Sequence, residues 1–266
     1  TQTKKIKKRP SFFKWPFIRG IANLIDMLVI GIKTLTWSAN QISDEEDEQL
    51  SSTQITFTLI LSIGFAILLF VALPYFLSVI TGVKEESSPI LFNLIDGIIK
   101  MAILLIYMYS ISLIKDIRRV FEYHGAEHKT VHCYEAGKTL TVKNIKKYST
   151  KHPRCGTSFI FIVFLISMFA FALIPTMLES LFPSFLSLPF WPRKGLLFMI
   201  RVPFILPIAS IAYEALKLSG KYTKNSIVRL ISYPGILLQY ITTKEPDKKQ
   251  IEVAIKSMEL VMTREK

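Results

Sequence analysis

Four long apolar stretches constrain what this chain can fold into. They cover about residues 54–81, 89–114, 157–181 and 195–216, and each is long enough for a helix to cross the hydrocarbon core of a bilayer. Inside lipid every backbone polar group needs a partner, and a helix supplies those partners within one segment. We therefore expect an all-α fold, a polytopic membrane protein with four transmembrane helices.

Amphipathic helices are expected at both ends of this bundle. Residues 12–39 place Arg19, Asp26 and Lys33 at intervals of seven, so the three charges share one face of a helix. Such a helix would lie at the membrane interface or pack on the other helices.

The tail holds two more amphipathic pieces. We expect residues 226–241 to be broken at Pro234–Gly235 and to lie at the interface. Residues 245–262 begin with Pro246 and Asp247, which are typical helix-entry residues, and then place a stripe of apolar side chains on one face.

The distribution of basic residues predicts the orientation. The segment up to residue 53, the segment 115–156 and the tail from 215 carry eight, ten and ten Lys and Arg residues, whereas the segments 83–87 and 183–194 carry one and two. Basic residues gather on the cytoplasmic side of membrane proteins. We therefore expect a multi-pass protein of the bacterial cytoplasmic (inner) membrane, with both termini and the middle segment in the cytoplasm.

The net charge of +13 fits contact with the lipid bilayer and its anionic headgroups. No basic stripe interleaved with aromatic residues is visible, so sequence-specific nucleic-acid binding is not expected. The pattern divides the chain into a basic N-terminal segment with an amphipathic helix and an acidic linker (1–53), two spans (54–114), a cytoplasmic His/Cys loop (115–156), two further spans (157–216) and an amphipathic tail (217–266). Because the first residue is threonine, we expect the chain to lack its true N-terminus, and no cleavable signal is visible.

All four histidines and both cysteines lie between residues 116 and 156. Imidazole and thiolate are donors that suit zinc, and two cysteines alone do not make a disulfide framework. His124 and His128 stand in an H-x-x-E-H pattern, so a helix would place both rings on one face with Glu127 beside them as general base. The sequence therefore predicts a zinc site in this segment.

The remaining ligands stay open at this level. His152 and Cys155 offer an imidazole and a thiol downstream, and Glu214 resembles the late glutamate ligand of zinc proteases with the inverted motif. Four protein ligands would make the zinc structural, whereas three ligands and a water would make it catalytic.

Long motifs in the chain resemble a known family. EYHGAEHKTVHCYEAG at 122–137, KYSTKHPRCGTSF at 147–159 and PGILLQYITTKEP at 234–246 are similar to the YqhQ-like family of bacterial integral membrane proteins, and RGIANLIDML at 19–28 and LPIASIAYE at 206–214 extend the resemblance over nearly the whole chain. The resemblance implies a predicted metal-dependent enzyme of unknown reaction. A glycine-rich segment that begins other members is missing from this chain.

Three functions follow as hypotheses. The first is a zinc-dependent hydrolase at the inner face of the membrane. The second is an interaction scaffold of membrane-protein biogenesis, folded by structural zinc and docked on a ribosome or translocon. The third is a transporter, because Asp96, Lys100 and Arg201 lie inside predicted spans.

Overall fold

The computed structural model describes residues 10–41, 51–85, 87–185, 187–222 and 225–265. Over these residues the chain forms helices and no strand, which confirms the all-α prediction. The predicted acidic linker lies outside the described residues.

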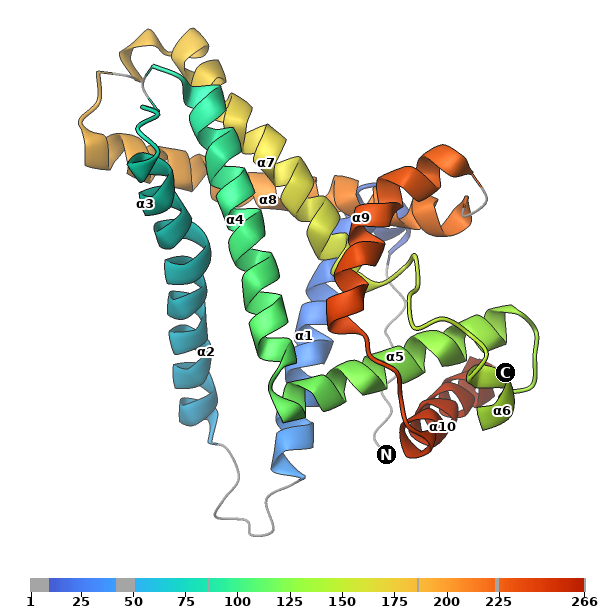
Figure 1. Cartoon of the computed structure of the whole chain (residues 1–266). Coiled ribbons are helices and arrows are strands. Elements are labelled where there is room, and N and C mark those ends of the chain that lie inside the picture. Colours follow the sequence, from blue (N-terminus) through green and yellow to red (C-terminus); the bar gives the residue numbers. More distant parts are fainter. Residues whose placement is uncertain (1–9, 42–50, 86, 186, 223–224, 266) are drawn as a thin grey trace. The chain divides into compact units, whose positions relative to one another are not determined.

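Figure 1 shows the helices and their labels along the chain. In chain order they are η1 (Ser11–Lys14), α1 (Ile18–Asn40), α2 (Ser52–Ile67), η3 (Leu68–Ala72), α3 (Leu73–Ile80), α4 (Pro89–Ser112), α5 (Lys115–Glu135), α6 (Val142–Ile145), α7 (Gly156–Leu181), η4 (Pro183–Phe185), α8 (Phe190–Lys221), α9 (Ser226–Thr242) and α10 (Lys248–Glu265).

The chain forms two compact units. The first unit comprises Thr1–Lys100 and Ile166–Glu214, and the second comprises Met101–Leu165 and Ala215–Lys266. The boundaries between them fall inside α4, α7 and α8. All four histidines and both cysteines belong to the second unit.

Four helical stretches are long and apolar enough to cross a membrane. They are Thr53–Ile80, Pro89–Ser112, Gly156–Leu181 and Trp191–Lys221, and they coincide with the four predicted spans. Large apolar side chains along them stay exposed, such as Phe57, Ile106 and Met199. This surface fits contact with lipid rather than with water.

The N-terminal helix begins later than predicted. Trp15 is extended, as residues before a proline prefer, and Pro16 follows it. Phe17 then adopts a left-handed φ of 68°, so α1 starts only at Ile18. In the first unit α1 meets α8, because Arg19 forms an ion pair with Glu214.

Polar side chains inside the first unit pair with one another. Asp96 forms an ion pair with Lys100 one turn further along α4. Arg201 on α8 donates a hydrogen bond of 2.8 Å from Nη2 to Asn93 Oδ1 on α4. These contacts lower the cost of keeping charged groups between apolar helices.

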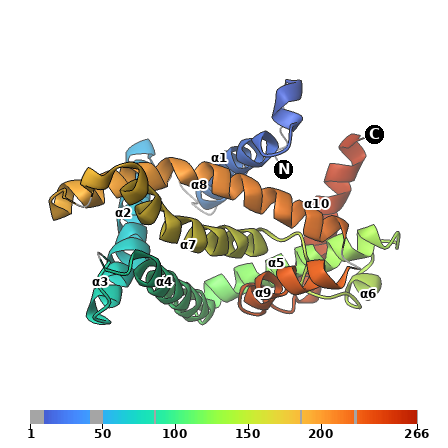
Figure 2. The ribbon, with the colours of Figure 1, turned by 90° about the horizontal axis from the view of Figure 1, so that it is seen from above.

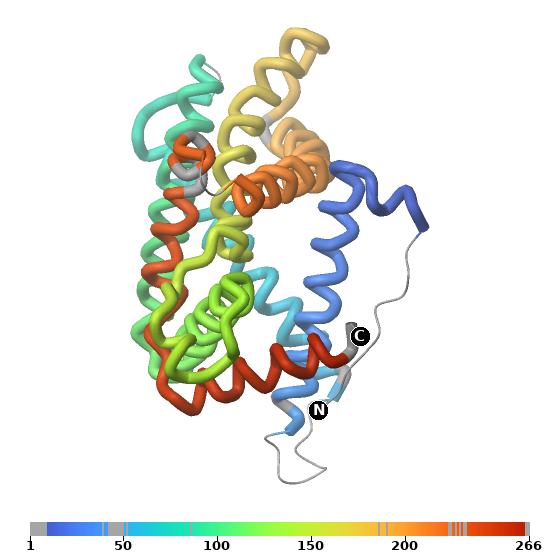
Figure 3. Tube along the Cα trace, turned by 90° about the vertical axis from the view of Figure 1, so that its right-hand side faces the viewer, coloured from blue at the N-terminus to red at the C-terminus, as the bar shows by residue number. Residues whose placement is uncertain are grey.

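In the second unit α5 packs against α10 and the short α6 (Figure 3). Ala126, Cys133, Ile145 and Ile251 are fully buried and form the common core of the three helices. The predicted entry of α10 is confirmed as a capping pair, because Asp247 Oδ1 accepts from the Gln250 amide at 2.8 Å and Gln250 Oε1 accepts from the Asp247 amide at 2.7 Å.

The expected break at Pro234–Gly235 is wrong, because α9 continues through it from Ser226 to Thr242. A proline inside a helix removes one backbone hydrogen bond but does not always end the helix. Gly235 allows α9 to lie against the beginning of α7, because a Cβ at this position would lie 2.8 Å from the Cβ of Ser158. The end of α9 then reaches α5 (Figure 2).

Candidate metal centre

Helix α5 presents histidines on one face because they are four residues apart. His124, His128 and His132 follow one another at this spacing, so they lie on one face of the helix. The ring centroids of His124 and His128 are 4.4 Å apart. The H-x-x-E-H pattern is therefore helical as expected. The segment 115–156 is not the predicted loop throughout, because α5 and α6 occupy much of it.

Gly125 lets another part of the chain approach this helix. A Cβ at this position would lie 2.0 Å from the backbone oxygen of Lys244, in the connection between α9 and α10. The amide of Lys244 also donates a hydrogen bond of 2.9 Å to the backbone oxygen of Phe121. The close approach brings the carbonyl of Thr242 to the ring of His124.

The connection between α6 and α7 supplies the remaining donors. Gln239 on α9 is fully buried and fixes its path at His152. The Gln239 side chain accepts from the His152 amide at 2.8 Å and donates to the His152 carbonyl at 2.9 Å and to Ser158 Oγ at 2.9 Å. All polar atoms of this amide therefore serve to hold the connection in place.

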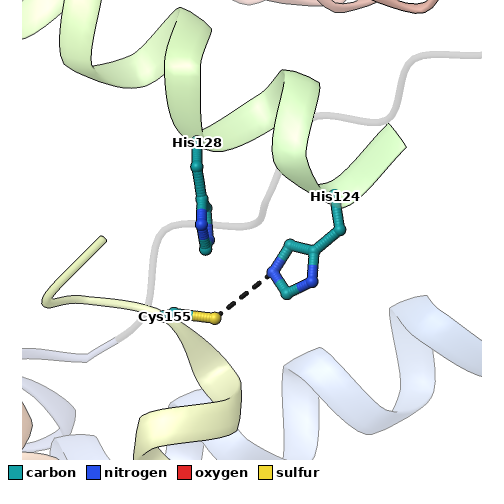
Figure 4. A group of neighbouring side chains, drawn as sticks. All are labelled: His124, His128 and Cys155. Atoms are coloured by element: carbon teal, nitrogen blue, oxygen red, sulfur yellow. Dashed lines mark hydrogen bonds between the residues drawn. The ribbon is translucent and has the colours of Figure 1, made fainter. Parts of the chain in front are cut away.

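His124, His128 and Cys155 form the first group of donors (Figure 4). One ligand atom from each lies within 4.8 Å of those from the other two. His124 Nε2 is 3.2 Å from Cys155 Sγ. His128 and Cys155 are buried and His124 is half-buried.

Backbone carbonyls select the tautomer of both histidines in this group. His124 Nδ1 is 2.9 Å from the carbonyl oxygen of Thr242, and His128 Nδ1 is 2.5 Å from that of Thr150. A carbonyl can only accept, so each Nδ1 carries the hydrogen and donates it. In the neutral rings the lone pairs are then on Nε2, as a metal ligand requires.

Cys155 is ionised easily. Burial would raise the pKa of its thiol, but hydrogen bonds from His124, His128 and Thr157 outweigh burial and lower this pKa to about 5. For His124, burial would lower the pKa, but the hydrogen bond and the charge of Cys155 outweigh it and raise this pKa. Without a metal, Cys155 is therefore a thiolate at neutral pH, and it favours the protonated form of the neighbouring His124 ring.

His132, Glu135 and His152 form a second group whose ligand atoms also lie within 4.8 Å of one another. His132 and His152 have ring centroids 4.5 Å apart, and those of His152 and His128 are 5.7 Å apart. His152 therefore lies between the two groups. Burial, followed by the charge of His132, lowers the pKa of His152 to about 4, so its ring is neutral at neutral pH.

The structure brings together some of the predicted residues and separates others. His124, His128 and Cys155 converge, whereas His152 groups with His132 and Glu135. Glu214 belongs to the first unit and pairs there with Arg19, so its role as a ligand stays a prediction.

The side chain of Glu127 is exposed and lines a cavity of about 380 Å³ between α5 and α10. It does not belong to either donor group among the described residues, so its role as general base also stays a prediction.

Sequence reasoning missed Glu135. A signal was present, because Glu135 lies three residues after His132 and therefore on the same face of α5. The partners that orient the histidines, Thr150 and Thr242, act through backbone carbonyls. Their side chains give no signal in the sequence.

Comparison with known proteins identifies a family for this chain. The family model described as "Protein of unknown function (DUF1385)" matches residues 15–264. A curated relative, "Uncharacterized protein YqhQ" of Bacillus subtilis (strain 168), is 35% identical over 263 residues, which covers 92% of this chain and 76% of the relative. No solved structure matches the chain. The chain therefore belongs to the YqhQ-like DUF1385 family.

Proposed function

We propose that this protein is a zinc-dependent hydrolase that acts at the cytoplasmic face of the inner membrane. The observation that carries the proposal is the convergence of two imidazoles and one thiolate at His124, His128 and Cys155. Bonds of about 2.1 Å to nitrogen and 2.3 Å to sulfur, at the tetrahedral angle, would hold the two donors about 3.6 Å apart. The observed separation of 3.2 Å between His124 Nε2 and Cys155 Sγ is close to this value.

The surroundings of the three donors support a bound ion. Carbonyls hold both histidines in the tautomer that directs Nε2 toward the site. Thr157 contacts Cys155 Sγ through its hydroxyl at 3.1 Å and donates its amide hydrogen from 3.4 Å. Such outer partners are typical of metal sites, because they orient the ligands before the ion binds.

Three protein ligands leave a fourth position for water. Bound zinc would lower the pKa of that water to about 7, which provides hydroxide at neutral pH. Glu127 remains our proposal for the general base, since it lies on α5 between the two histidines and its charge contributes to raising the pKa of His124. The cavity that it lines also contains apolar side chains, such as Val131, Val253 and Met258, which suit an apolar part of a substrate.

The test combines metal content with activity. We expect the purified full-length protein to contain zinc and to hydrolyse members of a panel of phospholipids, lipid esters and peptides. Cys155→Ser should lose zinc and activity together, and Glu127→Gln should keep zinc and lose activity. Asp116→Asn, which removes an exposed carboxylate from the same helix, is the control and should behave as wild type. Activity that survives in Glu127→Gln would remove Glu127 from the reaction.

A structural zinc site is the second candidate, because His152 lies next to His128 and would provide a fourth ligand. The protein would then be a scaffold, and the exposed Lys143, Lys146 and Lys147 would contact anionic headgroups or a ribosome or translocon. X-ray absorption at the zinc edge separates the two functions: four protein ligands would favour the scaffold, and three with a water would favour the hydrolase.

A transporter is the third candidate. Among the described residues, Asp96 Oδ1 and Arg201 Nε are buried without a hydrogen-bond partner, and both lie inside candidate spans. The ion pair of Asp96 with Lys100 instead favours a role in folding. Ion uptake by proteoliposomes that Asp96→Asn abolishes would support transport, and its absence in wild type would exclude it for the ions tested.

A further inference from the structure

A second group of metal donors lies beside the proposed zinc site. His132 and Glu135 are three residues apart on α5, and His152 comes from the connection that precedes α7. His152 is buried, His132 is half-buried, and the side chain of Glu135 is 34% exposed. An ion therefore has a route to this group from solvent at Glu135.

Each member is held by a partner outside the group, as in the first group. His132 Nε2 donates to the carbonyl of Lys151 at 2.8 Å, which leaves the lone pair of the neutral ring on Nδ1. Glu135 Oε1 accepts from Arg154 Nη2 at 2.7 Å, which leaves Oε2 directed at His152. A ligating carboxylate is commonly held in this way through its other oxygen.

The spacing of the donors also fits a shared ion. His152 Nε2 and Glu135 Oε2 are 3.4 Å apart, which is a long hydrogen bond between nitrogen and oxygen. Two bonds of about 2.1 Å to a common ion at the tetrahedral angle place their donors about 3.4 Å apart.

Binding at His152 has an identifiable cost. The amide of Arg154 donates to His152 Nδ1 from 3.2 Å, so the neutral ring carries its hydrogen on Nε2 when no ion is bound. For Nε2 to bind a metal, this proton must move through solvent to Nδ1, and the bond from the amide is lost. No net proton is released in this step. Two long hydrogen bonds are given up, the one from the Arg154 amide and the one from His152 Nε2 to Glu135 Oε2.

We infer that His132, Glu135 and His152 form a second divalent-metal site, adjacent to the first. Its donors are two nitrogens and one oxygen without sulfur, a set that also suits harder first-row ions such as Fe²⁺ and Mn²⁺. His128 and His152, with centroids 5.7 Å apart, connect the two groups. A role for this ion in hydrolysis rests on the proposed function, whereas its binding does not.

Co²⁺ distinguishes the two sites, because thiolate ligation gives an intense charge-transfer absorption that nitrogen and oxygen ligands do not give. Full-length protein in detergent is freed of metal with a chelator and titrated with Co²⁺. The bound metal is counted by elemental analysis after desalting. We expect wild type to bind a second equivalent of Co²⁺ after the thiolate absorption is saturated.

Variants assign each ion to its group. Glu135→Gln and His132→Asn should each lose one equivalent and keep the thiolate absorption, and Cys155→Ser should lose the absorption and keep the other equivalent. His132→Asn is included because Glu135→Gln also releases Arg154. Asp116→Asn is the matched control and should bind as wild type. Circular dichroism checks that each variant is folded.

Two outcomes would contradict the second metal site, and one would support it while contradicting the proposed function. Wild type that stops at one thiolate-bound equivalent has no second site, although the zinc site of the proposed function would stand. The same conclusion follows if His132→Asn and Glu135→Gln bind as much Co²⁺ as wild type. In a third outcome, wild type binds Co²⁺ without any thiolate absorption, and His132→Asn and Glu135→Gln abolish this binding. That result would support the second site and contradict the proposed function.

Discussion

At Cys155 the environment acts on the thiol in opposite directions. Burial disfavours the thiolate, and the hydrogen bonds from His124, His128 and Thr157 favour it more strongly, so its pKa falls from an ordinary 9.0 to about 5. A group whose pKa is lower in the folded state adds stability that is lost as the pH falls through the folded pKa. His124 has a raised pKa, so its contribution is complete below about 6.5 and is lost as the pH rises through that raised value.

We therefore expect the metal-free protein to gain stability between about pH 5 and pH 6.5, where only the thiol of this pair titrates. Thermal unfolding in detergent, followed by circular dichroism, measures this gain. Cys155→Ser cannot form a thiolate and should show a smaller rise over the same range. Equal pH profiles for the two proteins would contradict the ionised pair.

Gly125 provides the second prediction at the scale of a residue. Gly125→Ala would place a Cβ 2.0 Å from a backbone oxygen, and we expect it to destabilise the second unit by about 3 kcal/mol. Gly64→Ala is the control, because a Cβ there meets nothing within 4 Å, so it should be neutral or stabilise α2 by up to about 1 kcal/mol. Thermal unfolding of both variants tests the contrast, and similar melting temperatures would contradict it.

Among the elements, α10 depends most clearly on its apolar face. Ile251 is fully buried against α5 and α6, whereas Val253 on the same helix is 50% exposed. We expect Ile251→Ala to cost about 2–4 kcal/mol of stability, and Val253→Ala less than about 1 kcal/mol. Urea unfolding of the two variants measures both values. Equal losses would mean that α10 does not pack on α5 through Ile251.

The sequence predicted those elements whose pattern is local. The helical turn that carries His124 and His128 follows from their spacing, although the rest of α5 was expected as a loop. Helix α10 follows from its entry residues and apolar stripe. The break predicted in α9 was wrong because the rule for Pro234 and Gly235 is also local. Helix α9 stays continuous where Gly235 packs against Ser158. Ser158 lies 77 residues earlier in the chain than Gly235, so a local rule does not include this contact.

For the whole molecule, the four spans were predictable because hydropathy adds up along a segment without reference to its neighbours. Beyond the pair of His124 and His128, the candidate metal donors were predictable as residue types and not as groups. Which donors meet depends on how Gln239 directs the connection before α7, and this places His152 beside Glu135 rather than in the first group. No spacing in the sequence encodes that path.

Orientation in the membrane is a prediction at the same scale. In intact cells, a membrane-impermeant maleimide should label Ser184→Cys, between the last two spans, and should not label Lys138→Cys or Glu259→Cys. The distribution of basic residues predicts that the latter two positions lie in the cytoplasm. Both native cysteines are buried, which keeps the background low. The reverse labelling pattern would invert the predicted topology.

The carbonyl that orients His124 belongs to Thr242, 118 residues further along the chain. During synthesis, a nascent polypeptide that has exposed both α5 and Cys155 still lacks this carbonyl. Until then, no carbonyl fixes the tautomer of His124. For the proposed zinc site, we therefore expect ion binding to follow the synthesis of α9, and a chain interrupted before the end of α9 should bind zinc more weakly.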